Sequence, residues 1–164
     1  MKKILLFLTF ATALMTQAQN VLESDFNTVH GTAPFSKITN AQYEPAIDRG
    51  IRLALEGIDA ITSNPEPPTF ENTIVALERN GEDLNRVLNI FFPLLSADAD
   101  DEMLEISNRI SPKLSDFSTS ITLNNALWKR VKAVYDNRAN LKLTPEQQTL
   151  LQKTYDSFAL QGAN

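Results

Sequence analysis

Residues Thr39–Ile61 read T-N-A-Q-Y-E-P-A-I-D-R-G-I-R-L-A-L-E-G-I-D-A-I and carry the first sustained helical pattern in the chain. Thr39 and Gln42 are spaced as a capping box, in which each side chain satisfies a free backbone amide at a helix start. Pro45 falls near the first turn, where backbone donors have no helical partner, so it is compatible with a helix. The apolar residues beyond it recur at spacings of three and four and share one face; they are Tyr43, Ile47, Ile51, Ala54, Leu55, Ile58 and Ile61.

Prolines divide the chain after this helix. The run Asn64–Pro68, N-P-E-P-P, predicts a stiff connector, because proline removes a backbone donor and forces the preceding residue away from helical angles. Thr69 is then expected to cap a second helix, in which Gly81 bends or breaks the run and Pro93 ends or kinks it near Phe92. The apolar positions of that helix are Phe70, Ile74, Leu77, Leu84, Val87, Leu88 and Phe91.

Three further helices are predicted downstream. The acidic stretch from Asp98 to Glu102 suits the start of a third helix, where the dipole favours negative charge, and Pro112 predicts a kink within it. Asn124 or Asn125 is expected to cap a fourth helix, and Thr144-Pro145 with Gln147 a fifth. The apolar faces of these helices are Met103, Ile106, Ile110, Leu114, Phe117 and Ile121; Leu127, Val131, Val134 and Tyr135; and Leu151, Tyr155 and Phe158.

No alternation of apolar and polar residues is long enough to predict a strand, so the expected fold class is all-α. Short connectors predict that consecutive helices run antiparallel. The expected organisation is a signal peptide over residues 1–18, an irregular lead-in over 19–38 and a helical domain over 39–164. With 164 residues, of which 43% are hydrophobic, the chain has the composition of one globular domain.

The amino terminus has the pattern of a secretory signal. Lys2 and Lys3 give it a positive start, Ile4 to Met15 form a short apolar run, and Thr16 and Ala18 place small residues before a cleavage point after Ala18. The run is shorter than the roughly 20 residues that a membrane span needs. We therefore expect export, to the periplasm, with no membrane attachment after cleavage.

Charge argues against nucleic acid as a partner. Removal of Lys2 and Lys3 leaves 13 basic and 20 acidic residues, which takes the formal net charge from -5 to -7. The densest basic group is Lys129, Arg130 and Lys132, which we interpret as a solvated helix face rather than a phosphate-binding patch.

Few residues in the chain can perform metal or thiol chemistry. There is no cysteine, and the single histidine, His30, is interpreted as an exposed loop residue, since one histidine cannot build a histidine-based zinc site. The acidic group Asp98, Asp100, Asp101 and Glu102 fails the EF-hand pattern, which needs glycine and glutamate where Met103 and Arg109 stand.

The remaining candidates are interpreted as structural. Glu66, Glu71 and Glu78 could face one cleft as paired carboxylates, but glutamates at helical spacing are usually surface residues. Trp128 and the Phe91-Phe92 pair are expected in the core rather than at a ligand. The five glycines are too scattered for a phosphate-binding loop, and no serine stands in a nucleophile elbow. No catalytic or metal-binding residue is therefore assigned, and the substrate-binding residues are unknown.

One segment is specific to a family. Asn64–Arg79 reads N-P-E-P-P-T-F-E-N-T-I-V-A-L-E-R and, together with Tyr43-Glu44-Pro45-Ala46, resembles the amino-terminal region of the thimet oligopeptidase family of zinc metallopeptidases, which includes oligopeptidase A and the bacterial dipeptidyl carboxypeptidases. Later stretches such as Ile110–Leu114 and Tyr155–Phe158 fall in the order that this family shows. The resemblance covers about Phe35 to Ala163.

The resemblance implies a largely helical, two-lobed enzyme that admits short peptides to a deep channel, with the amino-terminal helices forming part of one wall. The family's zinc site lies in an H-E-x-x-H motif, which this sequence lacks. We therefore expect zinc in the complete enzyme and none bound by this chain, with the carboxy-terminal catalytic half as the missing partner. Two explanations stay open: a fragment of an exported peptidase, or a stand-alone helical peptide-binding module.

Overall fold

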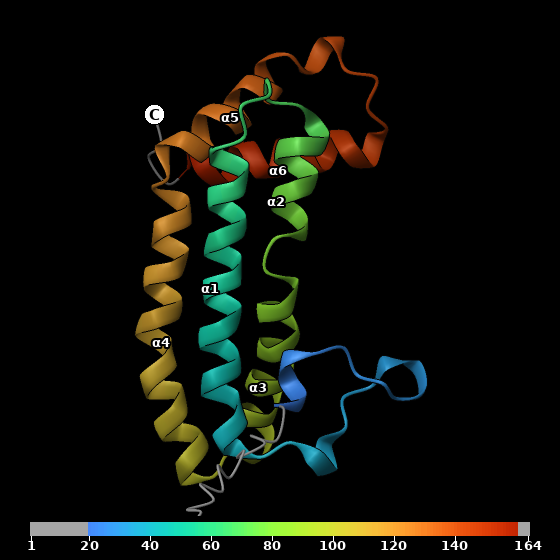
Figure 1. Cartoon of the computed structure of the whole chain (residues 1–164). Coiled ribbons are helices and arrows are strands. Elements are labelled where there is room, and N and C mark those ends of the chain that lie inside the picture. Colours follow the sequence, from blue (N-terminus) through green and yellow to red (C-terminus); the bar gives the residue numbers. More distant parts are fainter. Residues whose placement is uncertain (1–19, 161–164) are drawn as a thin grey trace, which may run out of the picture.

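The computed structural model describes residues 20–160, and all of the regular structure in that range is helical (Figure 1). The predicted signal peptide and Gly162 lie outside the described residues. The α-helices are α1 (Tyr43–Thr62), α2 (Ala76–Arg79), α3 (Glu82–Asp98), α4 (Asp101–Thr122), α5 (Asn125–Asp136) and α6 (Pro145–Ala159). A wide π-helical segment, η5 (Phe70–Val75), precedes α2, and a 3-10 turn, η6 (Arg138–Asn140), follows α5. Residues 20–160 contain no strand, which confirms the predicted all-α class.

Three long helices form one layer, with α1 in contact with both α3 and α4 (Figure 1). The chain runs along α1, returns through α3 and runs back along α4, so these consecutive helices are antiparallel as predicted. Helices α5 and α6 pack on each other and lie across the end of the layer where α1 ends. None of the helices between residues 20 and 160 has the length and apolar character of a membrane span.

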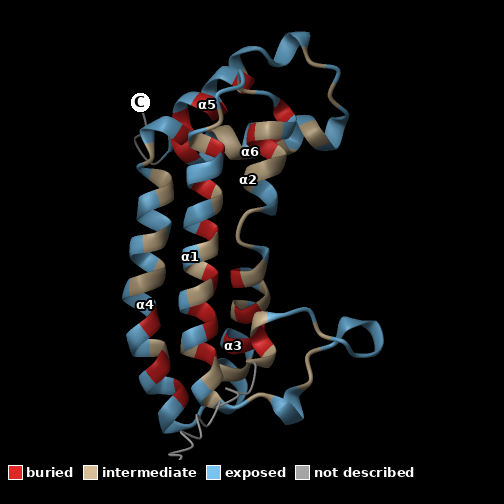
Figure 2. Ribbon diagram, viewed as in Figure 1, coloured by how far each residue is buried: buried red, intermediate tan, exposed pale blue. Residues whose placement is uncertain are grey.

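Two apolar clusters make up the core, and they lie at opposite ends of α1 (Figure 2). The first joins the start of α1 to α3 and α4; its fully buried side chains include Ile47, Phe91 and Ile110. The second joins the end of α1 to η5, α5 and α6, with Ile74, Leu127 and Leu151 fully buried. The two clusters make α1 the element that both ends of the fold share.

The lead-in contributes to the first cluster. It contains 3-10 turns at Val21–Glu23, Val29–Gly31 and Phe35–Lys37, and Leu22 in the first turn is completely buried. The Asn20 amide nitrogen donates to the Gln42 carbonyl at 2.8 Å, which fixes this segment beside the start of α1. The first turn of the lead-in is therefore packed on the helices, whereas Val29 and Phe35 further along it are exposed.

The predicted helix starts are confirmed by their hydrogen bonds. Gln42 Oε1 accepts from the Thr39 backbone at 2.9 Å, and Asn124 Oδ1 accepts from Leu127 at 3.0 Å. Thr144 and Gln147 form the reciprocal pair, at 3.3 and 3.0 Å. These signals are local in sequence, and local geometry satisfies them.

Pro93 was predicted to end or kink the second run near Phe92; it does not end the helix, because α3 continues to Asp98. Pro112 likewise lies inside α4. Both prolines are exposed, as are Asn89 and Asn108, the residues four positions earlier whose carbonyls lose a donor. Both prolines therefore lie on the solvent-facing side of their helices, where a missing backbone hydrogen bond costs less than it does in the core.

Gly81 does break the second helical run. Its φ of 83° lies in the left-handed region that glycine tolerates best, and α3 starts at the next residue. Two side chains predicted to be apolar core positions are instead exposed at the surface: Leu55 is 37% exposed and Phe92 is 38% exposed.

Candidate functional site

Arg130 is the clearest correction to the sequence analysis. It was expected on a solvated face with Lys129 and Lys132, but it is only 8% exposed. Its Nη1 donates to the carbonyls of Asn64 and Glu66, at 3.0 and 3.3 Å. The spacing within α5 indicates this burial: Arg130 stands three residues after Leu127 and four before Val134, so it shares a helix face with these two buried residues.

Asn72 completes the arrangement around Arg130. Its Oδ1 accepts from Arg130 Nη2 at 3.1 Å and from the Thr69 backbone at 2.8 Å, and its amide nitrogen donates to the Pro67 carbonyl at 3.0 Å. The connector is not helical, and its prolines 65, 67 and 68 have no backbone N–H group. Its carbonyls are therefore bonded by side-chain donors from other segments. Arg130 and Asn72 supply them and hold the connector against α5.

A cleft lies between the end of α5, η6 and the first half of α6. Its volume is about 500 Å³. Leu141, Leu143 and Leu151 give it apolar walls, and Tyr135, Arg138 and Gln148 supply polar groups. The cleft thus combines apolar walls and a cation within one part of the chain.

An aromatic stack forms the wall beside this cleft. The Tyr135 and Tyr155 rings stack with centroids 3.7 Å apart, and Trp128 lies 5.1 Å from Tyr155. The Arg138 guanidinium carbon lies 4.0 Å from the centroid of the Tyr135 ring, a cation–π distance. Trp128 is 7% exposed and Phe91 fully buried, so the prediction that they pack in the core is confirmed, whereas Phe92 is partly at the surface.

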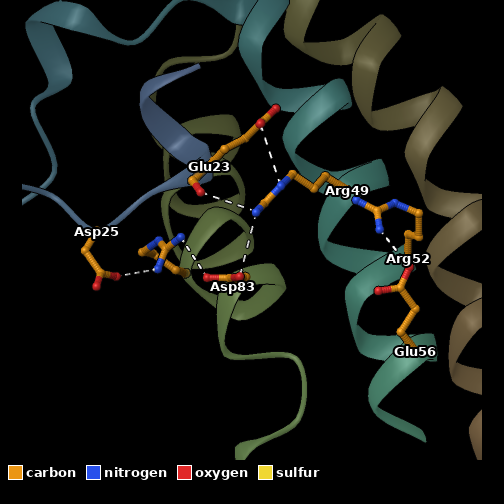
Figure 3. Close-up of polar contacts among 7 residues, drawn as sticks. Glu23, Asp25, Arg49, Arg52, Glu56 and Asp83 are labelled. Carbon is orange, nitrogen blue, oxygen red and sulfur yellow. Dashed lines mark hydrogen bonds and ion pairs between the residues drawn. The ribbon is translucent and has the colours of Figure 1, made fainter. Parts of the chain in front are cut away.

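Ion pairs join the lead-in to the helices (Figure 3). Arg49 of α1 lies 3.8 Å from both Glu23 and Asp83, while Arg86 of α3 contacts Asp25 at 3.0 Å and Asp83 at 2.9 Å. These contacts connect the first turn of the lead-in with α1 and α3. Their geometry indicates a structural role.

A second charged group joins α1 to α4. Glu44 accepts from Arg109 Nε at 2.8 Å and from Lys113 Nζ at 3.1 Å, and Lys113 also contacts Asp48 at 2.7 Å. The hydrogen bond from Arg109, followed by that from Lys113, lowers the pKa of Glu44 below its usual value. The hydrogen bonds to Asp48 and Glu44 raise the pKa of Lys113. Every charge in this group is partnered.

The acidic group predicted at a helix start is confirmed as a cap. Asp100 Oδ1 accepts from the Met103 backbone at 2.8 Å, and the Asn40 amide donates to both carboxylate oxygens of Asp100, at 3.1 and 2.8 Å. The Met103 hydrogen bond is the largest cause that lowers the pKa of Asp100. Asp98, in contrast, ends α3 rather than starting α4.

The predicted surface residues are where the sequence placed them. His30 is exposed, with a positive φ of 61°, as are Glu66, Glu71 and Glu78. Glu66 lies in the connector, Glu71 in η5 and Glu78 in α2, and no hydrogen bond between these carboxyls is found. Glu78 lines a shallow depression with Glu146 and Lys153.

The described residues do not fit a zinc site. Within residues 20–160, no three histidine, aspartate or glutamate side chains come together in a cluster that could hold a metal ion. A catalytic zinc typically takes three protein ligands, so no step of zinc chemistry is derived from these side chains. Zinc in a complete enzyme stays a prediction.

Comparison with curated proteins confirms the resemblance found at Asn64–Arg79. The chain is 39% identical over 129 residues to the dipeptidyl carboxypeptidase of Escherichia coli (strain K12), a match that covers 79% of this chain and 19% of the relative. It is 38% identical to the dipeptidyl carboxypeptidase of Salmonella typhimurium, with the same coverage. Oligopeptidase A of Escherichia coli is 25% identical over 129 residues, again 79% of this chain and 19% of the relative.

These homologues are enzymes of the thimet oligopeptidase family, as the sequence analysis predicted. The chain spans about a fifth of the length of the curated relatives that it matches. No protein-family model matches the chain.

Proposed function

We propose that this chain is one part of an exported zinc metallopeptidase that hydrolyses short peptides, of the dipeptidyl carboxypeptidase or oligopeptidase type. The observation that carries the proposal is the 39% identity to a dipeptidyl carboxypeptidase across 79% of this chain, combined with coverage of only 19% of that relative. Such a match is expected when the chain supplies one portion of a larger enzyme. In this proposal the zinc and its ligands belong to sequence outside the chain.

The geometry supports a structural role in that enzyme. Helix α1 has 20 residues, which corresponds to about 30 Å of helix, and α3 and α4 extend beside it in one layer. Ion pairs between Glu44 and Arg109 and between Asp48 and Lys113 tie the layer together. A stiff helical layer is suited to form a wall of a substrate channel, and we propose that this part has no peptidase activity alone.

A second function, that of a stand-alone helical peptide-binding module, is favoured by one observation. The cleft beside Arg138 is lined by residues of α5, η6, α6 and the connector between η6 and α6, all within this chain. In that case peptides would bind to this chain without being cleaved.

The coding DNA that follows the codon for Asn164 tests the proposed function. A continuing reading frame that contains H-E-x-x-H, whose product cleaves a quenched fluorescent peptide in a zinc-dependent manner, is the expected result. A stop codon followed by unrelated sequence would contradict the proposal of a larger peptidase and would favour the stand-alone peptide-binding module. Mature amino termini from a periplasmic fraction test the export part: a start at Gln19 is expected, and a retained Met1 contradicts export.

A further inference from the structure

The cleft between α5, η6 and α6 has the dimensions of a ligand site. Its volume of about 500 Å³ lies within the range of roughly 300–1,000 Å³ typical of small-molecule pockets. Leu141, Leu143 and Leu151 supply apolar walls that suit an aliphatic or aromatic group. Leu151 is 1% exposed and belongs to the core, whereas Leu141 and Leu143 are half-buried and pack against it.

Arg138 is a cation held in place at this cleft. Its Nη1 donates to the Tyr135 carbonyl at 2.9 Å, and its guanidinium lies over the Tyr135 ring. The ring is in turn fixed by its stack on Tyr155 and by a 2.9 Å hydrogen bond from Tyr135 Oη to Gln152 Oε1. Arg138 is exposed, and these contacts favour one position of its guanidinium, which reduces the entropy lost on binding.

The neighbouring carboxylates are engaged elsewhere. Asp136 Oδ2 contacts Lys132 Nζ at 2.6 Å, and Asp156 Oδ1 accepts from Gln152 Nε2 at 2.8 Å. Among residues 20–160, no carboxylate lies within ion-pairing distance of Arg138. A guanidinium carries five N–H donors in a planar fork, and one hydrogen bond to a carbonyl leaves most of them for a ligand.

We propose that this cleft binds the carboxyl end of a short peptide, with Arg138 holding the terminal carboxylate and the leucines holding an apolar last side chain. The planar fork of arginine matches a carboxylate in a bidentate manner, and the apolar walls disfavour a purely polar anion. The Gln148 amide nitrogen donates to the Leu143 carbonyl at 3.0 Å, which orients its Oε1 as an acceptor for a peptide N–H. The choice of a peptide as ligand rests on the proposed function.

Calorimetry and amide chemical-shift mapping on the full chain test this assignment with two probes: N-acetyl-Ala-Ala-Leu with a free carboxylate, and the same peptide with a carboxamide end. The acid is expected to bind about tenfold more tightly than the amide, because a charge-assisted hydrogen bond is lost in the amide. Shifts should concentrate at residues 135–152. Arg138→Gln should remove the preference for the acid, and Arg138→Lys, which keeps the charge but lacks the fork, should retain only part of it.

The matched control is Lys142→Gln, which removes one exposed positive charge near the cleft but leaves Arg138 intact. It should preserve the preference for the acid. Equal affinity of acid and amide, shifts elsewhere in the chain, an equal loss in the control, or no binding would each overturn the assignment. Inorganic phosphate that competes as well as the acid would also overturn it, in favour of a general anion site.

This experiment is separable from the test of the proposed function. A longer reading frame with zinc-dependent peptidase activity, together with no carboxylate-dependent binding here, would leave the peptidase proposal intact and remove only the cleft assignment. Binding as described without any longer frame would support the stand-alone module instead.

Discussion

Arg130 of α5 donates from Nη2 to Oδ1 of Asn72 in η5 across 3.1 Å, and this bond joins two segments that are 58 residues apart in the chain. The same guanidinium reaches the Asn64 and Glu66 carbonyls of the proline-rich connector. Since Asn72 also bonds to Thr69 and to Pro67, the pair fixes both the connector and the start of η5. The second core cluster is assembled around this junction.

Replacement of Arg130 by alanine is expected to lower the free energy of unfolding by about 2–4 kcal/mol, because the Asn64 and Glu66 carbonyls and the Asn72 oxygen lose charge-assisted, partly buried donors. Chemical denaturation followed by far-ultraviolet circular dichroism measures it. Lys129→Ala is the matched control: its side chain is exposed, so a change within about 0.5 kcal/mol is expected. An equal loss of unfolding free energy in both variants would contradict the stabilising role of the contacts from Arg130 to Asn72 and the connector.

Gly50 marks the close approach of α1 and α3. A Cβ added there would lie 2.9 Å from Leu84 Cα, and backbone cannot move aside as a flexible side-chain end can. Gly50→Ala is therefore expected to destabilise the protein by about 1–3 kcal/mol, although alanine is otherwise the better helix former. Thermal unfolding tests this prediction, which requires a lower melting temperature for Gly50→Ala than for the parent. A higher melting temperature would show that the two helices are less tightly packed at this point.

The ion-pair group at Glu44 predicts an acid-dependent loss of stability. The pKa of Glu44 is lowered in the folded state by its hydrogen bonds to Arg109 and Lys113, so its contribution is fully present above the unfolded value of 4.5 and is lost as the pH falls through the native pKa. Unfolding midpoints of the parent and Glu44→Gln should therefore converge as the pH falls below 4.5.

Glu56→Gln serves as the control for that titration. Within residues 20–160, Glu56 pairs only with Arg52, four residues away on the same helix, and both side chains are largely exposed. Its removal should therefore change the midpoint little at any pH. A pH dependence in Glu44→Gln that matches the parent would show that the contacts with α4 do not stabilise the fold.

The helix caps, the connector and the all-α class could be predicted because each depends on residues within a few positions of one another. Thr39 with Gln42 and Thr144 with Gln147 are examples. The role of Arg130 depends on partners 58 to 66 residues away, which periodicity alone does not identify. Its place on the apolar face of α5, between Leu127 and Val134, was the one local sign.

The cleft was missed for a similar reason. Tyr135 and Tyr155 were predicted on the apolar faces of separate helices, but their stacking and the position of Arg138 beside them follow from how α5 packs on α6. Pro93 and Pro112 show that a local sequence pattern can also suggest an interruption that the folded chain does not contain. Pro93 was predicted to end or kink its helix and Pro112 to kink its own, yet both lie inside helices that continue past them, on the solvent-facing side.

The purified chain, with or without added zinc, is expected not to hydrolyse a quenched fluorescent peptide. The reason is chemical: H-E-x-x-H is absent from the sequence, and the described residues do not gather three metal-ligating side chains in one place. Fluorescence should match that of a mock preparation from cells lacking the gene, while a known zinc peptidase in the same buffer confirms the assay. Zinc-dependent turnover that follows the chain through purification, and that a chelator abolishes, would mean that the catalytic groups lie within these 164 residues after all. The proposal that they lie outside the chain would then have to be abandoned.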